Sequence, residues 1–149
     1  MNTSLANMKG ISNGKVIDAD KEYAIAEEYR KKLKTKCPSV EQNVGNLSGG
    51  NQQKVLLAKW MFAEPDILIL DEPTRGIDVG AKYEIYCIIN DLVAAGKSVI
   101  MISSELPEVL GMSDRIYIMN EGRFVGEVGK EEATSELIMS KIVKSGKGA

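Results

Sequence analysis

The alternation of hydrophobic and polar positions divides the first part of the chain into two helical segments. Residues 18–36 are rich in charge, yet apolar side chains recur among them at helical spacing, which predicts an amphipathic surface helix. A second stripe follows Ser48, a good N-cap residue, and Pro65 marks the end of that helix. Its apolar positions are Val55, Leu56, Trp60 and Phe62.

The next segment has the pattern of strand, helix and strand. Residues 67–70 are four consecutive apolar residues, which predicts a strand buried on both faces of a parallel sheet. Asp78 can cap a helix that extends to about Ala95, and Gly96 ends this helix before a β-branched strand at residues 98–102. The helix has its apolar side at Tyr83, Tyr86, Ile89 and Val93. This order predicts a right-handed parallel crossover.

The last third of the chain predicts a short helix, a β-hairpin and a final helix. Residues 105–112 form the short helix, with Pro107 tolerated in its first turn. The runs RIYIMN and EGRFVGEV predict two strands joined by a turn, and residues 130–143 the last helix. The fold class is therefore α/β.

Composition narrows the class of protein. The 149 residues, 44% of them hydrophobic, can bury the core of one ordinary domain. The net charge of −2, without a basic block, excludes the usual footprint of nucleic-acid binding. Two cysteines, Cys37 and Cys87, fit neither a disulfide scaffold nor a metal site, which favours a reducing compartment. Apolar runs are far shorter than the roughly 20 residues that span a bilayer, and histidine chemistry is excluded because the chain has no histidine.

The start of the second predicted helix has the features of a phosphate site. Ser48 is followed by Gly49 and Gly50, so backbone N–H groups are left uncovered at the positive end of the helix dipole. Glycine leaves the approach of a ligand open. The same residues are also compatible with an ordinary capped helix after a flexible turn. Lys54 and Arg75 could reach phosphates, although exposed salt bridges are the simpler interpretation of both.

Two acids follow the first predicted strand. Asp71 and Glu72 lie at its carboxyl end, where ligands collect in open α/β sheets. Mg²⁺ prefers few carboxylates together with waters and phosphates, and an adjacent acid can orient an attacking water. The alternative is that both acids only cap the turn before Pro73.

In combination, these segments resemble the ATP-binding subunits of ABC transporters. LSGGNQQKV (47–55) is similar to their signature motif, and ILILDEPT (67–74) to their Walker B segment. TRGIDVGAK (74–82) resembles the D-loop region, and ISSELPEVLGMSDRI (102–116) the switch region. GGNQQK, DEPTRGIDVGAK and SSELPEVLG are most similar to the second half of the double-length ATPase subunits of bacterial monosaccharide importers of the ribose, galactose and xylose type.

The resemblance implies a role for each matching residue. In this family each ATP lies between the phosphate loop of one ATPase half and the signature motif of the other. The signature residues would therefore contact a nucleotide in trans: Ser48, Gly49, Gly50, Asn51 (in place of the usual glutamine) and Gln52. Asp71 would hold Mg²⁺ through water, Glu72 would polarise the attacking water, and Asp78 would lie at the seam between the halves. Ser104 stands where most relatives carry histidine, which implies weak hydrolysis at this half's own site.

The implied architecture is a partial P-loop NTPase fold that lacks the phosphate-loop strand. Residues 1–64 would belong to the helical signature subdomain and residues 65–149 to the catalytic core. The tripeptide at residues 96–98 is no phosphate loop, because it follows a helix and precedes a strand. We therefore expect the chain alone to bind ATP weakly, to hydrolyse none, and to self-associate, exchange strands or be locally disordered beside residues 67–70.

The resemblance also implies partners and a location. The partners would be the other ATPase half, membrane permease subunits and, indirectly, a periplasmic or surface sugar-binding protein, at the cytoplasmic face of the inner membrane. No nucleic-acid partner is expected. Two alternatives stay open: a non-catalytic regulatory half of the ATP sandwich, which Ser104 favours, and a soluble ABC ATPase that acts on nucleic acid or ribosomes.

Overall fold

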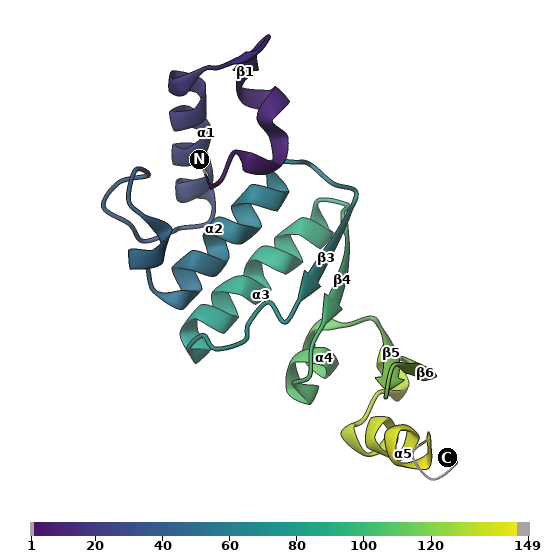
Figure 1. Cartoon of the computed structure of the whole chain (residues 1–149). Helices are drawn as coiled ribbons and strands as arrows, with labels where there is room; N and C mark the ends of the chain where they lie inside the picture. The colour runs from purple at the N-terminus through teal and green to yellow at the C-terminus, as the bar shows by residue number, and fades with distance from the viewer. Residues whose placement is uncertain (1, 146–149) are drawn as a thin grey trace. The chain divides into compact units, whose positions relative to one another are not determined.

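The computed structural model describes residues 2–145, which Figure 1 shows from end to end. The chain divides into two compact units, Met1–Ile100 and Met101–Ala149. Among the described residues, no helix has both the length and the apolar character needed to cross a membrane. Helices and short strands alternate, as the predicted α/β class requires.

The first unit begins with a short 3-10 helix and a small β-ribbon. Helix η1 (Leu5–Ile11) leads into strands β1 (Ser12–Asn13) and β2 (Val16–Ile17), which pair antiparallel around Gly14 at φ +66°. The sequence pattern did not indicate these elements, because two-residue strands carry no detectable alternation.

Helix α1 (Ala19–Lys32) confirms the predicted amphipathic helix. Asp18 caps it, since its side chain accepts a hydrogen bond from the Lys21 N–H. The helix ends before Lys36, and Lys34 follows it with a left-handed φ of +51°. After the short 3-10 helix η2 (Val44–Asn46) comes α2.

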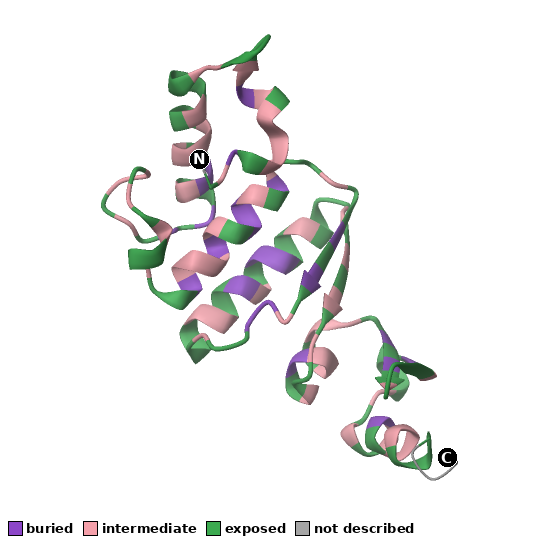
Figure 2. Ribbon diagram, viewed as in Figure 1, coloured by how far each residue is buried: buried purple, intermediate pink, exposed green. Residues whose placement is uncertain are grey.

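Helix α2 (Gly49–Met61) was predicted, but its buried face was not. Leu56 and Trp60 are 43% and 46% exposed, so the predicted apolar stripe is wrong at these two positions. The helix contacts α1 and the third helix along a different line. This buried line consists of Gly50, Lys54, Leu57, Ala58 and Met61 (Figure 2). A hydrophobic pattern misses it because it begins with a glycine and a lysine.

Strand β3 (Ile67–Asp71), helix α3 (Val79–Ala94) and strand β4 (Ser98–Ile102) form the predicted strand–helix–strand unit. The two strands are hydrogen-bonded neighbours. The N–H of Ser98 donates to the carbonyl of Asp66 at 3.0 Å, which places the starts of the strands side by side. The strands therefore run in the same direction.

Two burial predictions for this strand–helix–strand segment are wrong. Leu68 and Leu70 are buried, but Ile67 and Ile69 on the opposite face of β3 are 59% and 64% exposed, so the strand is covered on one side only. Helix α3 buries Ile85, Ile88 and Ile89, whereas the expected Tyr83 and Val93 are exposed. A continuous apolar run cannot show which of its faces a neighbouring element covers.

The second unit contains the short helix α4 (Leu106–Met112) and a hairpin of β5 (Arg115–Asn120) and β6 (Arg123–Gly129), as predicted. The strands pair antiparallel, with Arg115 opposite Gly129 and a bulge after Ile118. Glu121 and Gly122 both have positive φ, as a two-residue hairpin turn requires.

The last helix begins later than predicted. A 3-10 turn, η3 (Lys130–Glu132), precedes α5 (Ser135–Ser145), because the Thr134 hydroxyl accepts a hydrogen bond from the Leu137 N–H at 3.1 Å and caps α5 there. Helix α5 contacts both β5 and β6. The core of this unit is formed by Ile116, Ile118, Val128 and Ile138.

Candidate functional site

The first turn of α2 is open at its N-terminus. Ser48 has the extended backbone of an N-cap residue, but its side chain does not cap the helix. Its hydroxyl oxygen instead accepts a hydrogen bond from Asn51 Nδ2 at 2.8 Å. The Ser48 carbonyl accepts the N–H of Gln52 and so begins the helical ladder. Because no side chain caps this turn, the positive end of a 13-residue helix is available to an anion.

Asn51 and Gln52, both expected to contact nucleotide, bond to the chain itself. The Asn51 Oδ1 accepts the backbone N–H of Lys36 at 2.8 Å, so this side chain joins the α1–α2 connection to the first turn of α2. The Gln52 Nε2 donates to the carbonyl of Leu47 at 2.8 Å. These bonds hold the segment before α2 against the helix. Neither contact could be seen in the sequence.

Gly50 is required by the packing of two helices. It is buried in α2, and a Cβ added at this position would lie 2.5 Å from the Cβ of Ala81 in α3. At exposed Gly49, an added Cβ would lie 3.3 Å from Ile77 Cγ2. Glycine at position 50 therefore permits the close approach of α2 and α3, in addition to leaving access for a ligand.

The starts of α2 and α3 border one open hollow of about 260 Å³. At α3, the exposed Asp78 side chain accepts the N–H of Ala81 at 2.9 Å, which confirms the predicted cap. The two helix ends therefore differ, because a carboxylate neutralises the start of α3 and no charged cap neutralises that of α2. The hollow is lined by Lys36, Ser48, Gly50, Asn51, Asp78, Gly80, Ala81 and Glu84.

Lys54 forms a salt bridge, but its side chain is buried and not exposed as expected. Its ammonium lies 2.7 Å from Glu84 Oε2, but its side chain is only 3% exposed, against 48% for Glu84. The Lys54 ammonium also donates to the carbonyl of Lys34 at 3.2 Å. The hydrogen bond and the charge of Lys54 lower the pKa of Glu84 below its ordinary value. Lys54 thus ties α2 to α3 and to the end of α1, and does not reach out to phosphate.

The two acids lie where β3 ends and turns, Asp71 as its last residue and Glu72 directly after it. Asp71 is exposed and Glu72 is partly buried, with a left-handed φ of +46° that is uncommon outside glycine. Pro73 and Thr74 behind them are buried, and the N–H of Arg75 donates to the Glu72 carbonyl at 3.2 Å. The buried residues hold the strained backbone in place, as is common at functional turns.

The carboxylates at the end of β3 fit the expected magnesium ion. Within residues 2–145 there is no cluster of three metal-ligating side chains. Mg²⁺ in nucleotide sites needs no such cluster, because one or two carboxylates, waters and phosphate oxygens complete its shell. The exposed Asp71 at the end of β3 supplies a carboxylate of that kind.

Ser104 is exposed and belongs to the second unit, in the connection between β4 and α4. Beside it, the Ser103 hydroxyl donates a short hydrogen bond to the buried Glu108 and accepts the N–H of Glu105 at 3.1 Å. These bonds shape the connection that carries Ser104.

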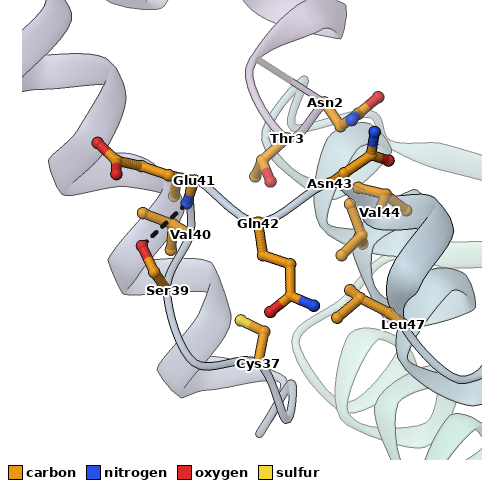
Figure 3. Close-up of a pocket in the computed structure, with 12 residues that line it drawn as sticks. Asn2, Thr3, Cys37, Ser39, Val40, Glu41, Gln42, Asn43, Val44 and Leu47 are labelled. Atoms are coloured by element: carbon orange, nitrogen blue, oxygen red, sulfur yellow. Dashed lines mark hydrogen bonds between the residues drawn. The ribbon is translucent and has the colours of Figure 1, made fainter.

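A second hollow, of about 360 Å³, lies along the segment before α2 (Figure 3). Side chains shape its wall, since the Ser39 hydroxyl accepts the N–H of Glu41 and Asn43 Oδ1 accepts that of Gly45. Cys37 lines it with a free thiol. No predicted site residue lines this hollow, and sequence patterns gave no sign of it.

Comparison with known proteins agrees with these features. A family model described as "ABC transporter" matches residues 2–75. The chain is 62% identical to the L-arabinose transport ATP-binding protein of Geobacillus stearothermophilus and 58% identical to the xylose import ATP-binding protein of Geobacillus kaustophilus. A ribose import ATP-binding protein of Clostridium perfringens is 56% identical. The matches cover 97%, 93% and 95% of this chain but 28% of each relative, so the chain spans less than a third of their length.

Solved structures show the same fold. A nucleotide-free ATP-binding cassette from an ABC transporter superposes with a TM-score of 0.78 at 24% identity, over 99% of this chain and 62% of that one. The ADP conformation of an ATP-binding cassette of an ABC transporter gives a TM-score of 0.69 at 28% identity, over 87% of this chain and 50% of that one. These matches show that the chain belongs to the ABC transporter family.

Proposed function

We propose that the chain is part of the ATP-binding subunit that energises import of a monosaccharide, and that its signature segment contacts ATP held by the other ATPase half. The open first turn of α2 supports this assignment most directly. Ser48 leaves that turn uncapped beside a hollow, whereas Asp78 closes the start of α3 in the same hollow. A helix end of this kind favours a phosphate.

The physical consequence is an association that depends on the γ-phosphate. Backbone N–H groups at Gly49 and Gly50 and the hydroxyl of Ser48 would donate to γ-phosphate oxygens. ADP lacks this phosphate, so the contact is lost after hydrolysis and the two halves separate. Binding energy that exists only with ATP present is what couples hydrolysis to movement.

The half's own site would use the two acids at the end of β3. Asp71 would hold Mg²⁺ through water, and Glu72 would polarise the water that attacks the γ-phosphate. Bound Mg²⁺ would supply neutralisation of phosphate charge. Ser104 cannot carry the positive charge of an imidazolium, so it would stabilise the transferring phosphoryl group less well than histidine. We infer an asymmetric pair in which this chain completes the more active site of the other half.

The relatives support a class of substrate and a set of partners. Those described above are named for arabinose, xylose and ribose, which favours a pentose or hexose as the transported class. Their names favour an importer over a soluble ATPase of nucleic acid or ribosomes. The partners would be a second ATPase half, membrane permease subunits and a periplasmic or surface sugar-binding protein. The chain would then act peripherally at the cytoplasmic face of the inner membrane, and alone it could also self-associate.

The test uses the full-length subunit that contains this chain. Ser48→Arg would place a large side chain on the open turn, and we expect ATP turnover to fall about 100-fold, as when a donor to the reacting oxygen is lost. Glu72→Gln should reduce turnover much less, because it affects the weaker site. Asn90→Arg, on an exposed position near the other end of α3, is the matched control and should be silent. Equal losses from Ser48→Arg and Glu72→Gln would contradict the asymmetric pair.

A non-catalytic regulatory half is the second candidate, favoured by Ser104. A single-turnover assay with one site blocked at a time separates the two. Slow but measurable phosphate release at the Glu72 site supports a weak catalytic site, and complete absence of release supports the regulatory half.

A further inference from the structure

We propose that Asn51 is a positioning residue that directs the proton of the Ser48 hydroxyl toward the bound phosphate. This inference rests on the proposed function, because it assigns a role within the same signature contact. A chain of hydrogen bonds runs from the Lys36 N–H through the Asn51 amide to the Ser48 oxygen.

The orientation of the Asn51 amide is fixed by the Lys36 backbone N–H beside it. The Lys36 backbone N–H can only donate, and it lies 2.8 Å from one end of the Asn51 amide. That end must therefore be the oxygen, which leaves the Nδ2 group facing Ser48. A backbone donor thus decides the orientation, and an exchange of the amide's oxygen and nitrogen would put two donors in contact.

The Ser48 hydroxyl can accept one hydrogen bond and donate another at the same time. Because Asn51 Nδ2 donates to Ser48 Oγ at 2.8 Å, this oxygen serves as an acceptor within the protein. The Ser48 side chain is exposed and does not cap α2. In the part of the chain that the structure describes, no acceptor is recorded for its proton. That proton can therefore point into the hollow that Lys36, Ser48 and Asn51 line together.

The start of α2 differs from an ordinary helix start. The side chain at the third helical position often reaches back to the backbone N–H of the N-cap residue, while the N-cap side chain covers the first turn. Here Asn51 occupies that third position but donates to the N-cap side chain instead. This keeps the Ser48 oxygen away from the first-turn N–H groups. Both the hydroxyl proton and those N–H groups are then available to one anion.

The substitution Asn51→Asp tests the direction of the hydrogen bond. Aspartate is nearly isosteric and still accepts the Lys36 N–H. Its other oxygen cannot donate to Ser48 and would instead accept a hydrogen bond from the Ser48 hydroxyl, which would turn the hydroxyl proton away from the phosphate. In the full-length subunit, we expect the ATP concentration for half-maximal closure of the two halves to rise roughly 10- to 100-fold, as for a lost charge-assisted bond. Hydrogen exchange at Lys36 and the thermal midpoint should stay at wild-type values.

The neutral variant Asn51→Leu separates positioning from the added charge of aspartate. If Asn51 acts through Ser48, Asn51→Leu should weaken ATP-driven closure several-fold in the wild type and have little further effect in Ser48→Ala. Additive losses in this cycle would overturn the proposal. The proposal would also be overturned if Asn51→Asp closed at the same ATP concentration as the wild type. Faster hydrogen exchange at Lys36 or a lower thermal midpoint in Asn51→Asp would overturn it too, because either result indicates a purely structural role.

Ser48→Arg distinguishes failure of this inference from failure of the proposed function. If Ser48→Arg leaves ATP-driven closure unchanged, the signature contact itself is wrong, and the role of Asn51 is refuted with it. If Ser48→Arg abolishes closure while Asn51→Asp behaves like the wild type, the contact stands and only the positioning role is refuted.

Discussion

The ammonium of Lys54 lies 2.7 Å from the carboxylate of Glu84, and the two partners differ sharply in exposure, at 3% and 48%. This asymmetry decides what each substitution does. Removing the carboxylate leaves a buried positive charge, whereas removing the lysine leaves a carboxylate that water can solvate. The pair joins α2 to α3 next to the proposed phosphate contact.

We therefore expect Glu84→Gln to destabilise the chain more than Lys54→Met. Loss of the carboxylate should lower the free energy of unfolding by about 2 kcal/mol, and loss of the lysine by about 1 kcal/mol or less. Urea denaturation of each variant measures both values. Lys97→Met, which removes the more exposed pair with Asp66, is the control and should change stability by about 0.5 kcal/mol or less. The reverse order for the two main variants would refute the burial asymmetry.

The same pair predicts a pH dependence. The pKa of Glu84 is lowered in the folded protein because Lys54 donates to it and lies close with its positive charge. Folding thus favours the ionised carboxylate, so the stabilisation is fully present above the unfolded pKa of about 4.3 and is lost as the pH falls through the lower folded pKa. In acid titrations, the wild type should lose stability more steeply than Glu84→Gln. Parallel curves would show that the shift is absent.

Gly50→Ala should weaken the contact between α2 and α3. The added methyl group would lie 2.5 Å from the Cβ of Ala81, so the helices must move apart, at about 1–3 kcal/mol. Ala81→Gly in the same chain should restore part of this loss. Gly111→Ala in α4 is the matched control, since nothing lies within 4 Å of its added Cβ, and it should be neutral or slightly stabilising. Thermal melts of these three variants and the wild type test the packing, and equal effects of Gly50→Ala and Gly111→Ala would contradict it.

The exposed face of the β3–β4 sheet predicts self-association of the isolated chain. Ile67, Ile69 and Ile100 are 59%, 64% and 51% exposed, and apolar surface of this kind is buried when copies meet. Ile69→Thr keeps the β-branched shape but introduces a hydroxyl. It should lower the weight-average molecular mass measured by sedimentation equilibrium. Val79→Thr, at a position 84% exposed outside the sheet, should leave that average unchanged. A monomeric wild type at all concentrations would refute the prediction.

Local signals predicted the elements well, because they depend on neighbours in the chain. The caps at Asp18 and Asp78 could be identified from their position before helical stripes, and the hairpin of the second unit from its turn. The start of α5 was misplaced because one hydroxyl, that of Thr134, decides it. Burial was predicted less well. Which face of α2 is covered depends on Ala81, some thirty positions away from Gly50, and no local pattern records that contact.

The same distinction between local and distant signals applies to the candidate site. The signature and Walker B residues could be recognised because their types and spacing are conspicuous in a single sequence. The bond from Lys36 to Asn51 joins residues 15 positions apart through a backbone N–H, which has no sequence signature. The burial of Lys54 was missed for a related reason, because a lysine is expected to be exposed unless its partner is known.

The central claim is that the open turn after Ser48 binds the γ-phosphate of an ATP carried by the other half. The most direct measurement is a structure of the full-length subunit with ATP, in which the distances from the Ser48 hydroxyl and the Gly50 N–H to the nearest γ-phosphate oxygen are read. We expect distances of about 2.7–3.2 Å, in the range of charge-assisted hydrogen bonds. A γ-phosphate held entirely by other residues, with a side chain or solvent filling the first turn of α2, would contradict the claim.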